Sequence, residues 1–185
     1  MVRKENNFYF VIGLILIASF SRIIPHYPNY TPIIAISLFG GKYFVNRTLA
    51  FFLPVFTLWL SDLIINNFIL DYFKTFIFFY PGFYWQYLSV LLISFIGRNY
   101  INKISTFKLF GVSIFSSLFF FVISNFGVFI SSSIYPKDFN GLLLCYTAAI
   151  PFFYGTLISS IIYTFSLFGL YELINLYKLK SHKNN

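Results

Sequence analysis

The sequence is 185 residues long, and its composition excludes a water-soluble protein. Hydrophobic residues make up 58% of the chain, charged residues only 10%, and the mean hydropathy is +0.77, whereas soluble domains carry about 25% charged residues. A membrane-spanning helix needs about 20 apolar residues, so the length allows about six spans and no separate soluble domain. We therefore expect one all-α integral membrane domain over residues 1–185, surrounded by the lipid bilayer.

The formal net charge is +8, but the pattern of basic residues does not indicate nucleic-acid binding. Lysines and arginines stand singly between hydrophobic stretches instead of forming the clusters that bind phosphates. Cys145 is the single cysteine, so no internal disulfide can form, and no Cys/His cluster matches a zinc, haem or iron–sulfur site. We expect neither a nucleic-acid partner nor a metal or other cofactor.

Six apolar stretches are predicted to cross the membrane. The first has no Ala-x-Ala cleavage site after it, so we expect a spanning helix rather than a signal peptide. The second is short and contains Gly40-Gly41, which indicates a helix packed among its neighbours rather than facing lipid. The predicted spans are residues 8–24, 32–44, 48–65, 83–101, 107–131 and 151–176.

Two segments between these spans are too polar to cross a membrane. Residues 66–74 contain two asparagines, an aspartate and a lysine, and residues 138–149 precede the sixth span. We expect both segments to form loops or helices that lie in the membrane interface. Pro151 then occupies the first turn of the sixth helix, where its missing N–H costs nothing.

The distribution of positive charge predicts the orientation of the bundle. Six spans place both termini and the loops 42–48 and 98–108 on one side, and this side holds ten of the 13 Lys and Arg residues. Cytoplasmic loops carry the excess of positive charge, so we expect an inner-membrane protein with both termini in the cytoplasm. The ten residues are Arg3, Lys4, Lys42, Arg47, Arg98, Lys103, Lys108, Lys178, Lys180 and Lys183; the other side holds Arg22, Lys74 and Lys137.

Asp62 stands out because it is the acidic residue that falls well inside a predicted span. Counting from Thr48 at 1.5 Å per residue places it roughly 21 Å along the third helix, toward the outer end. A carboxylate at that depth needs a partner or a water-filled cavity. Arg22 ends the first helix at the same level, so we expect an ion pair. This pair could clamp two helices together or belong to a solute site, and both interpretations stay open.

Other polar side chains fall at the same outer level. Ser124-Asn125-Phe126-Gly127 interrupts a strongly apolar run, and because an amide in hydrocarbon needs a partner, we predict a helix break that lines a cavity there. The candidate solute-binding residues are Arg22, Asn29, Tyr30, Thr31, Asp62, Asn125 and Tyr146.

The polar residues and the motifs of the sequence argue against an enzyme, a channel or a pump. Intramembrane aspartyl proteases need two carboxylates on facing helices, and serine or metal hydrolases need a histidine in the site, whereas His26 and His182 fall outside the predicted spans. The chain carries no filter sequence and no nucleotide-binding motif. A solute-binding transport subunit and a structural or assembly protein remain.

Short strings spread over most of the chain resemble a bacterial family of uncharacterised small membrane proteins that are usually labelled as transport proteins. These strings are Ser21-Arg22, Asn29-Tyr30-Thr31-Pro32, Leu38-Phe39-Gly40-Gly41, Ser61-Asp62, Ser124-Asn125-Phe126-Gly127, Tyr135-Pro136-Lys137 and Ala149-Ile150-Pro151-Phe152-Phe153. That family in turn is similar to the substrate-binding S components of energy-coupling-factor transporters. The resemblance implies a six-helix bundle with both termini in the cytoplasm that captures a vitamin or related micronutrient at its outer face. It also implies a shared ATPase module as the energising partner.

We therefore predict an S-component-like transport protein that binds a small polar or heteroaromatic solute for uptake. Asn29 and Thr31 are expected to supply hydrogen bonds from the loop that caps the site, while Asn125 and Tyr146 close its far wall. The alternative is a non-transporting structural or assembly protein whose polar residues only lock helices together. S components typically dock on their partner through Ala-x-x-x-Ala spacing on the first helix, whereas this chain has Gly13 and Ile17 there.

Overall fold

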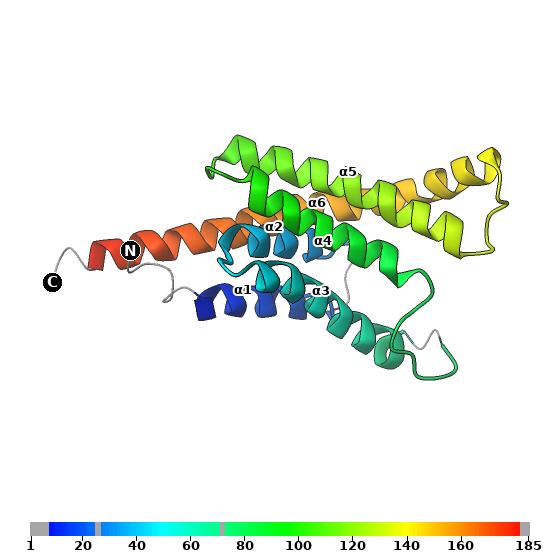
Figure 1. The fold of residues 1–185 in the computed structure, drawn as a ribbon, viewed down its shortest axis with the longest axis horizontal. Coiled ribbons are helices and arrows are strands. Elements are labelled where there is room, and N and C mark those ends of the chain that lie inside the picture. The colour runs from blue at the N-terminus through cyan, green and yellow to red at the C-terminus, as the bar shows by residue number, and fades with distance from the viewer. Residues whose placement is uncertain (1–7, 25–26, 71–72, 182–185) are drawn as a thin grey trace.

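The computed structural model describes residues 8–24, 27–70 and 73–181 (Figure 1). Over these ranges the protein consists of helices joined by loops and contains no β-strand. Residues named above that lie outside these ranges are Arg3, Lys4, His26, His182 and Lys183.

Six α-helices and one π-helical turn form the described part of the chain, which confirms the all-α class. In chain order they are α1 (Phe8–Phe20), α2 (Ile33–Tyr43), α3 (Arg47–Ile64), the π-helical turn η1 (Ile65–Ile69), α4 (Phe83–Tyr100), α5 (Thr106–Ser131) and α6 (Phe139–Ser181). Three helical stretches are long and apolar enough to cross a membrane: Arg47–Ile69, Thr106–Ser131 and Phe139–Tyr177. Helices α1 and α2 are apolar but shorter.

Helix α2 lies at the centre of the bundle, between the side formed by α1 and α3 and the side formed by α5 and α6 (Figure 1). The residues Ile33 to Gly41, nine of the 11 in this helix, are buried. It contacts all five of the other α-helices. The expectation that this short helix is packed among its neighbours is therefore confirmed.

Two glycines allow α2 and α4 to touch through their backbones. A Cβ atom on Gly41 would lie 2.1 Å from the carbonyl oxygen of Ser94, and one on Gly97 would lie 2.3 Å from the carbonyl oxygen of Leu38. Real Cβ atoms do not approach an oxygen so closely, so neither position has room for a side chain. Small residues at such contacts let the backbones of two apolar helices approach closely. The resulting van der Waals packing stabilises the helix pair where the hydrophobic effect does not.

Helix α6 begins at Phe139, so the predicted start of the sixth helix near Pro151 is wrong. The Asp138 side chain accepts a hydrogen bond from the backbone N–H of Gly141 at 2.8 Å, which caps an earlier N-terminus. Pro151 lies inside the helix and not in its first turn. The helix has 43 residues and is about 64 Å long at 1.5 Å per residue, about twice the thickness of a bilayer's hydrocarbon core.

The end of α3 also differs from the prediction. Residues 65–69, which include Asn66 and Asn67, continue the helix as the π-helical turn η1 beyond the predicted end of the third span at residue 65. Asn67 then holds the following loop: its amide nitrogen donates to the carbonyls of Leu63 and Ile77, and its amide oxygen accepts from the N–H of Ile77, all at 2.8 Å. The polar atoms of the Asn67 side chain all have backbone hydrogen-bond partners. A polar residue at this position is therefore compatible with a helix that continues past it.

Candidate functional site

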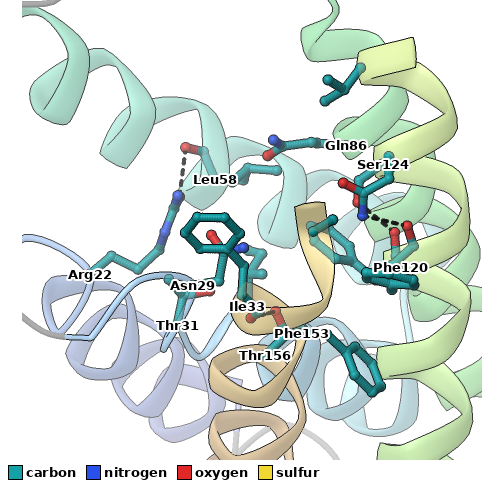
Figure 2. Close-up of a pocket in the computed structure, with 15 residues that line it drawn as sticks. Arg22, Asn29, Thr31, Ile33, Leu58, Gln86, Phe120, Ser124, Phe153 and Thr156 are labelled. Atoms are coloured by element: carbon teal, nitrogen blue, oxygen red, sulfur yellow. Dashed lines mark hydrogen bonds between the residues drawn. The ribbon is translucent and has the colours of Figure 1, made fainter. Parts of the chain in front are cut away.

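A cavity of about 190 Å³ lies among the loop before α2 and the helices α2 to α6 (Figure 2). Its polar wall is formed by Arg22, Asn29, Thr31, Gln86, Ser124, Asn125 and Thr156. Its apolar wall includes Phe120, Phe121, Phe152 and Phe153. Arg22 lies on one side of the cavity and Ser124 on the opposite side (Figure 2), so the space is enclosed by residues that are distant in the sequence.

Arg22 reaches the cavity because the chain turns tightly after α1. The backbone N–H of Arg22 donates to the carbonyl of Ser19 at 3.1 Å, which continues the helix as a tighter turn. Its Nη1 donates to the carbonyl of Leu58 at 3.3 Å and to the hydroxyl of Ser61. Its Nη2 lies 2.8 Å from Oδ1 of Asp62, and 11% of each side chain is exposed. The predicted ion pair is therefore present, and it joins the end of α1 to α3.

One donor of Arg22 is not used by these contacts. Its Nε atom is buried and has no hydrogen-bond partner among the described residues, while the side chain lines the cavity. A buried donor without a partner costs roughly 1–3 kcal/mol.

Asp62 does not line the cavity itself. Its carboxylate lies behind Arg22 and also accepts a 3.5 Å hydrogen bond from the hydroxyl of Tyr87. Nearby, in the loop that follows η1, the hydroxyl of Tyr80 is buried and has no hydrogen-bond partner in the part of the chain that the structure describes. Burial raises the pKa of Tyr80, the negative charge of Asp62 raises it further, and the Arg22 charge lowers it. Tyr80 is therefore a neutral O–H donor beside the ion pair.

The loop before α2 is held on the cavity by a strained turn and a glycine. Asn29 has a φ of 59°, a left-handed conformation that asparagine adopts more easily than most residues. Pro28 packs against α6, where a Cβ on Gly155 would lie 2.3 Å from the Pro28 carbonyl oxygen. Asn29 is exposed and lines the cavity together with Thr31, so the cavity opens to the surface beside this loop.

Helix α5 runs without a break through Asn125, so the predicted helix break is wrong. Asn125 donates from its amide nitrogen to the carbonyl of Phe121 at 2.8 Å, and the hydroxyl of Ser124 donates to the carbonyl of Phe120 at 2.7 Å. These bonds to the preceding turn satisfy the polar donors within the helix. Both side chains nevertheless line the cavity, as the sequence predicted for this segment.

Besides Asp62, two of the predicted site residues, Tyr30 and Tyr146, lie near the cavity without lining it. The ring of Tyr146 packs against Phe121 with centroids 5.7 Å apart, and its hydroxyl donates to the carbonyl of Val122 at 2.7 Å. Tyr146 thus lies behind the wall that Phe121 forms. The ring of Tyr30 faces Tyr163, with centroids 6.0 Å apart.

Several residues that line the cavity are not among those predicted from the sequence. Gln86 in α4 and Thr156 in α6 add an amide and a hydroxyl to its wall. Each is a polar residue in an apolar run, which was the available signal. The phenylalanines carried no signal because the chain contains 28 of them. Among the described residues, no group of His, Cys, Asp or Glu side chains could hold a metal ion.

Comparison with known proteins places the chain in a family without assigning its activity. No curated protein and no solved structure matches it. The model of a family of unknown function, DUF6580, matches residues 3–182, and the chain therefore belongs to the DUF6580 family.

Proposed function

We propose that this chain is a six-span protein of the bacterial inner membrane that captures a small polar or heteroaromatic solute from outside the cell for uptake. Both termini lie in the cytoplasm, and the solute binds in the cavity beside Arg22. The observation that carries the proposal is the cavity itself, which opens beside an exposed loop and has the Arg22 side chain together with several amides and hydroxyls on its wall. A protein that only locks helices together has no need of such a space.

The directions of the helices support the outward orientation of the cavity. The cavity residues come from the turn after α1, the start of α2, the later part of α3, the early part of α4 and the later part of α5. In an up-and-down bundle these segments meet at one end, opposite the end that carries Lys42, Arg98 and Lys103. By the positive-inside rule the basic end is cytoplasmic, so the cavity faces the outside.

The volume of the cavity and the residues that line it indicate the class of solute that it can bind. A volume of about 190 Å³ is smaller than the roughly 300–1,000 Å³ of sites for drug-sized ligands, which favours a molecule built on a single ring. Phe120, Phe121, Phe152 and Phe153 offer ring faces and edges for such a molecule. Amides and hydroxyls can bond its polar atoms, and the guanidinium group of Arg22, whose side chain lines the cavity, is suited to a carbonyl, a carboxylate or a ring nitrogen.

Import of the bound solute needs an energy source, and the resemblance to S components suggests a shared ATPase module. The alternative function is a structural one, in which the cluster around Arg22 serves only to join α1 and α3. Its support is that Arg22 contacts Leu58, Ser61 and Asp62 at once. The two functions differ in whether the cavity takes a ligand.

The test is the thermal stability of the detergent-purified protein in the presence of vitamins, nucleobases and amino acids. A ligand at 100 times its Kd should stabilise the folded state by about 2.7 kcal/mol. The test is repeated on Asn125→Leu, with Asn99→Leu as the matched control. Both asparagines donate to the carbonyl four residues earlier, at 2.8 Å and 2.9 Å, but only Asn125 lines the cavity.

A shift that is specific to one compound, lost in Asn125→Leu and kept in Asn99→Leu, would support solute capture. If no compound stabilises the wild-type protein, the capture of these solutes is wrong and the structural function stands.

A further inference from the structure

A second hollow lies on the outside of the bundle, between α4 and α5. This groove has a volume of about 440 Å³ and shares no residue with the solute cavity. Its lining includes Leu92, Phe95 and Tyr100 of α4 and Lys108, Gly111 and Phe119 of α5. Phe95 is 50% exposed, so the groove presents apolar side chains to the surroundings of the protein.

The groove exists in part because residue 111 is a glycine. A Cβ atom built on Gly111 meets no atom within 4 Å, so the space beside it is open. The same position could carry a large side chain without a clash inside the protein. Gly111 therefore gives a way of filling the groove while leaving the packing of α4 on α5 unchanged.

One end of the groove is basic and the rest is apolar. Lys108 lies in the first turn of α5, close to the end of α4 where Tyr100 lines the groove. Within the described ranges, the ammonium group of Lys108 makes no hydrogen bond and no ion pair. Lys103 in the connecting loop is exposed and adds positive charge at the same end. This end is therefore suited to an anion.

The length of the groove matches one leaflet of a bilayer. Tyr100 and Leu92 are eight residues apart on α4, and Lys108 and Phe119 are eleven apart on α5, which gives about 12 Å and about 16 Å of helix. Half of the hydrocarbon core of a bilayer is about 15 Å thick. An acyl chain whose headgroup lies at Lys108 would therefore run along the groove toward the middle of the membrane.

We propose that this groove binds one anionic phospholipid, with an acyl chain between α4 and α5 and the phosphate at Lys108. In the proposed orientation it belongs to the cytoplasmic leaflet, where anionic lipids are recognised by basic pockets between helices. The inference rests on the membrane insertion in the proposed function and does not depend on solute capture. A second copy of the chain or a partner helix fits less well, because an apolar partner would bury the unpaired Lys108 ammonium.

The experiment is native mass spectrometry of the purified full-length protein after addition of phosphatidylglycerol or phosphatidylcholine. Gly111→Leu fills the groove, and Gly169→Leu is its control because a Cβ on Gly169 also meets nothing within 4 Å. Lys108→Gln removes the charge at the groove, and Lys103→Gln removes a neighbouring charge outside it.

The wild-type protein should retain phosphatidylglycerol in preference to phosphatidylcholine. Gly111→Leu should abolish this retention, and Lys108→Gln should reduce it about fivefold, as expected for one lysine near an anionic headgroup. Gly169→Leu should retain the lipid like the wild type, and Lys103→Gln, whose charge lies outside the groove, should lower retention less than Lys108→Gln does. These results would stand even if no solute stabilised the protein.

Equal retention of the two lipids, or unchanged retention in Lys108→Gln and Gly111→Leu, would overturn the proposal. If Gly111→Leu instead converts a dimer into a monomer, the groove is occupied by a second copy and the lipid assignment is wrong.

Discussion

The guanidinium of Arg22 and the carboxylate of Asp62 form a buried ion pair, with Nη2 2.8 Å from Oδ1. The pair joins the turn after α1 to the later part of α3, segments separated by 40 residues in the sequence. Arg22 also lines the cavity, while its Nε is buried without a hydrogen-bond partner among the described residues. The same arginine therefore contributes to the packing of two helices and to the wall of the candidate site.

Asp62→Asn should destabilise the protein, because it removes one partner of a buried pair and leaves the Arg22 charge uncompensated. We expect a loss of about 3–5 kcal/mol in the free energy of unfolding, measured by thermal or denaturant unfolding in detergent. The double variant Arg22→Met/Asp62→Leu removes both charges and should recover most of this loss. An Asp62→Asn protein as stable as the wild type would show that Asp62 is not needed to compensate Arg22.

Gly155→Val should disturb the loop that holds Asn29 and Thr31 on the cavity. A Cβ at position 155 would lie 2.3 Å from the carbonyl oxygen of Pro28, so the loop must move away from α6. We expect overpacking to cost about 1–3 kcal/mol of stability and to weaken any stabilisation by a solute. Gly169→Val, with open space at its Cβ, is the control and should leave solute stabilisation intact.

Gly41→Ala should separate α2 from α4, since the added methyl group would lie 2.1 Å from the carbonyl oxygen of Ser94. A backbone atom cannot rotate away as a side chain can, so we expect a loss of at least about 1–3 kcal/mol, seen as a lower Tm. Gly13→Ala is the matched control, because its Cβ meets nothing within 4 Å. Alanine favours the helix by about 0.5–1 kcal/mol over glycine, so this control should be as stable as the wild type or more so.

The sequence predicted the helices whose ends are marked by local signals. The burial of α2 followed from its short length and from Gly40-Gly41, and the ends of α4 and α5 lie within one residue of the predicted spans. Pro151 predicts a later start of α6 than the structure shows, because proline is common in the first turn of a helix. The better signal was Asp138, an N-cap residue directly before an apolar run, and its hydrogen bond to Gly141 marks the true start.

The candidate site was predicted only in part, because the sequence does not show which face of a helix points into a cavity. Arg22, Asn29, Thr31 and Asn125 line it, whereas Tyr146 lies behind Phe121. The rotation of each helix is set by packing between segments far apart in the chain. The predicted break at Asn125 is absent because the side-chain amide of Asn125 donates to a carbonyl in the preceding turn of the same helix.

The proposed topology can be tested by labelling single cysteines in intact cells with a membrane-impermeant maleimide. The native Cys145 is only 2% exposed, so it should remain unlabelled and need not be replaced. Lys74→Cys and Ser133→Cys lie in exposed loops on the side of the cavity, and Lys103→Cys lies in the exposed α4–α5 loop at the basic end.

Six spans with both termini in the cytoplasm predict that Lys74→Cys and Ser133→Cys are labelled from outside, and that Lys103→Cys is labelled only after the membrane is permeabilised. All three positions are polar and exposed in the structure, so a difference in labelling reports the side of the membrane rather than burial in the protein. Labelling of Lys103→Cys from outside, with Lys74→Cys protected, would show that the bundle is inserted in the opposite direction. Labelling of Lys74→Cys and Lys103→Cys from the same side would exclude the six-span arrangement, because α4 would then not cross the membrane.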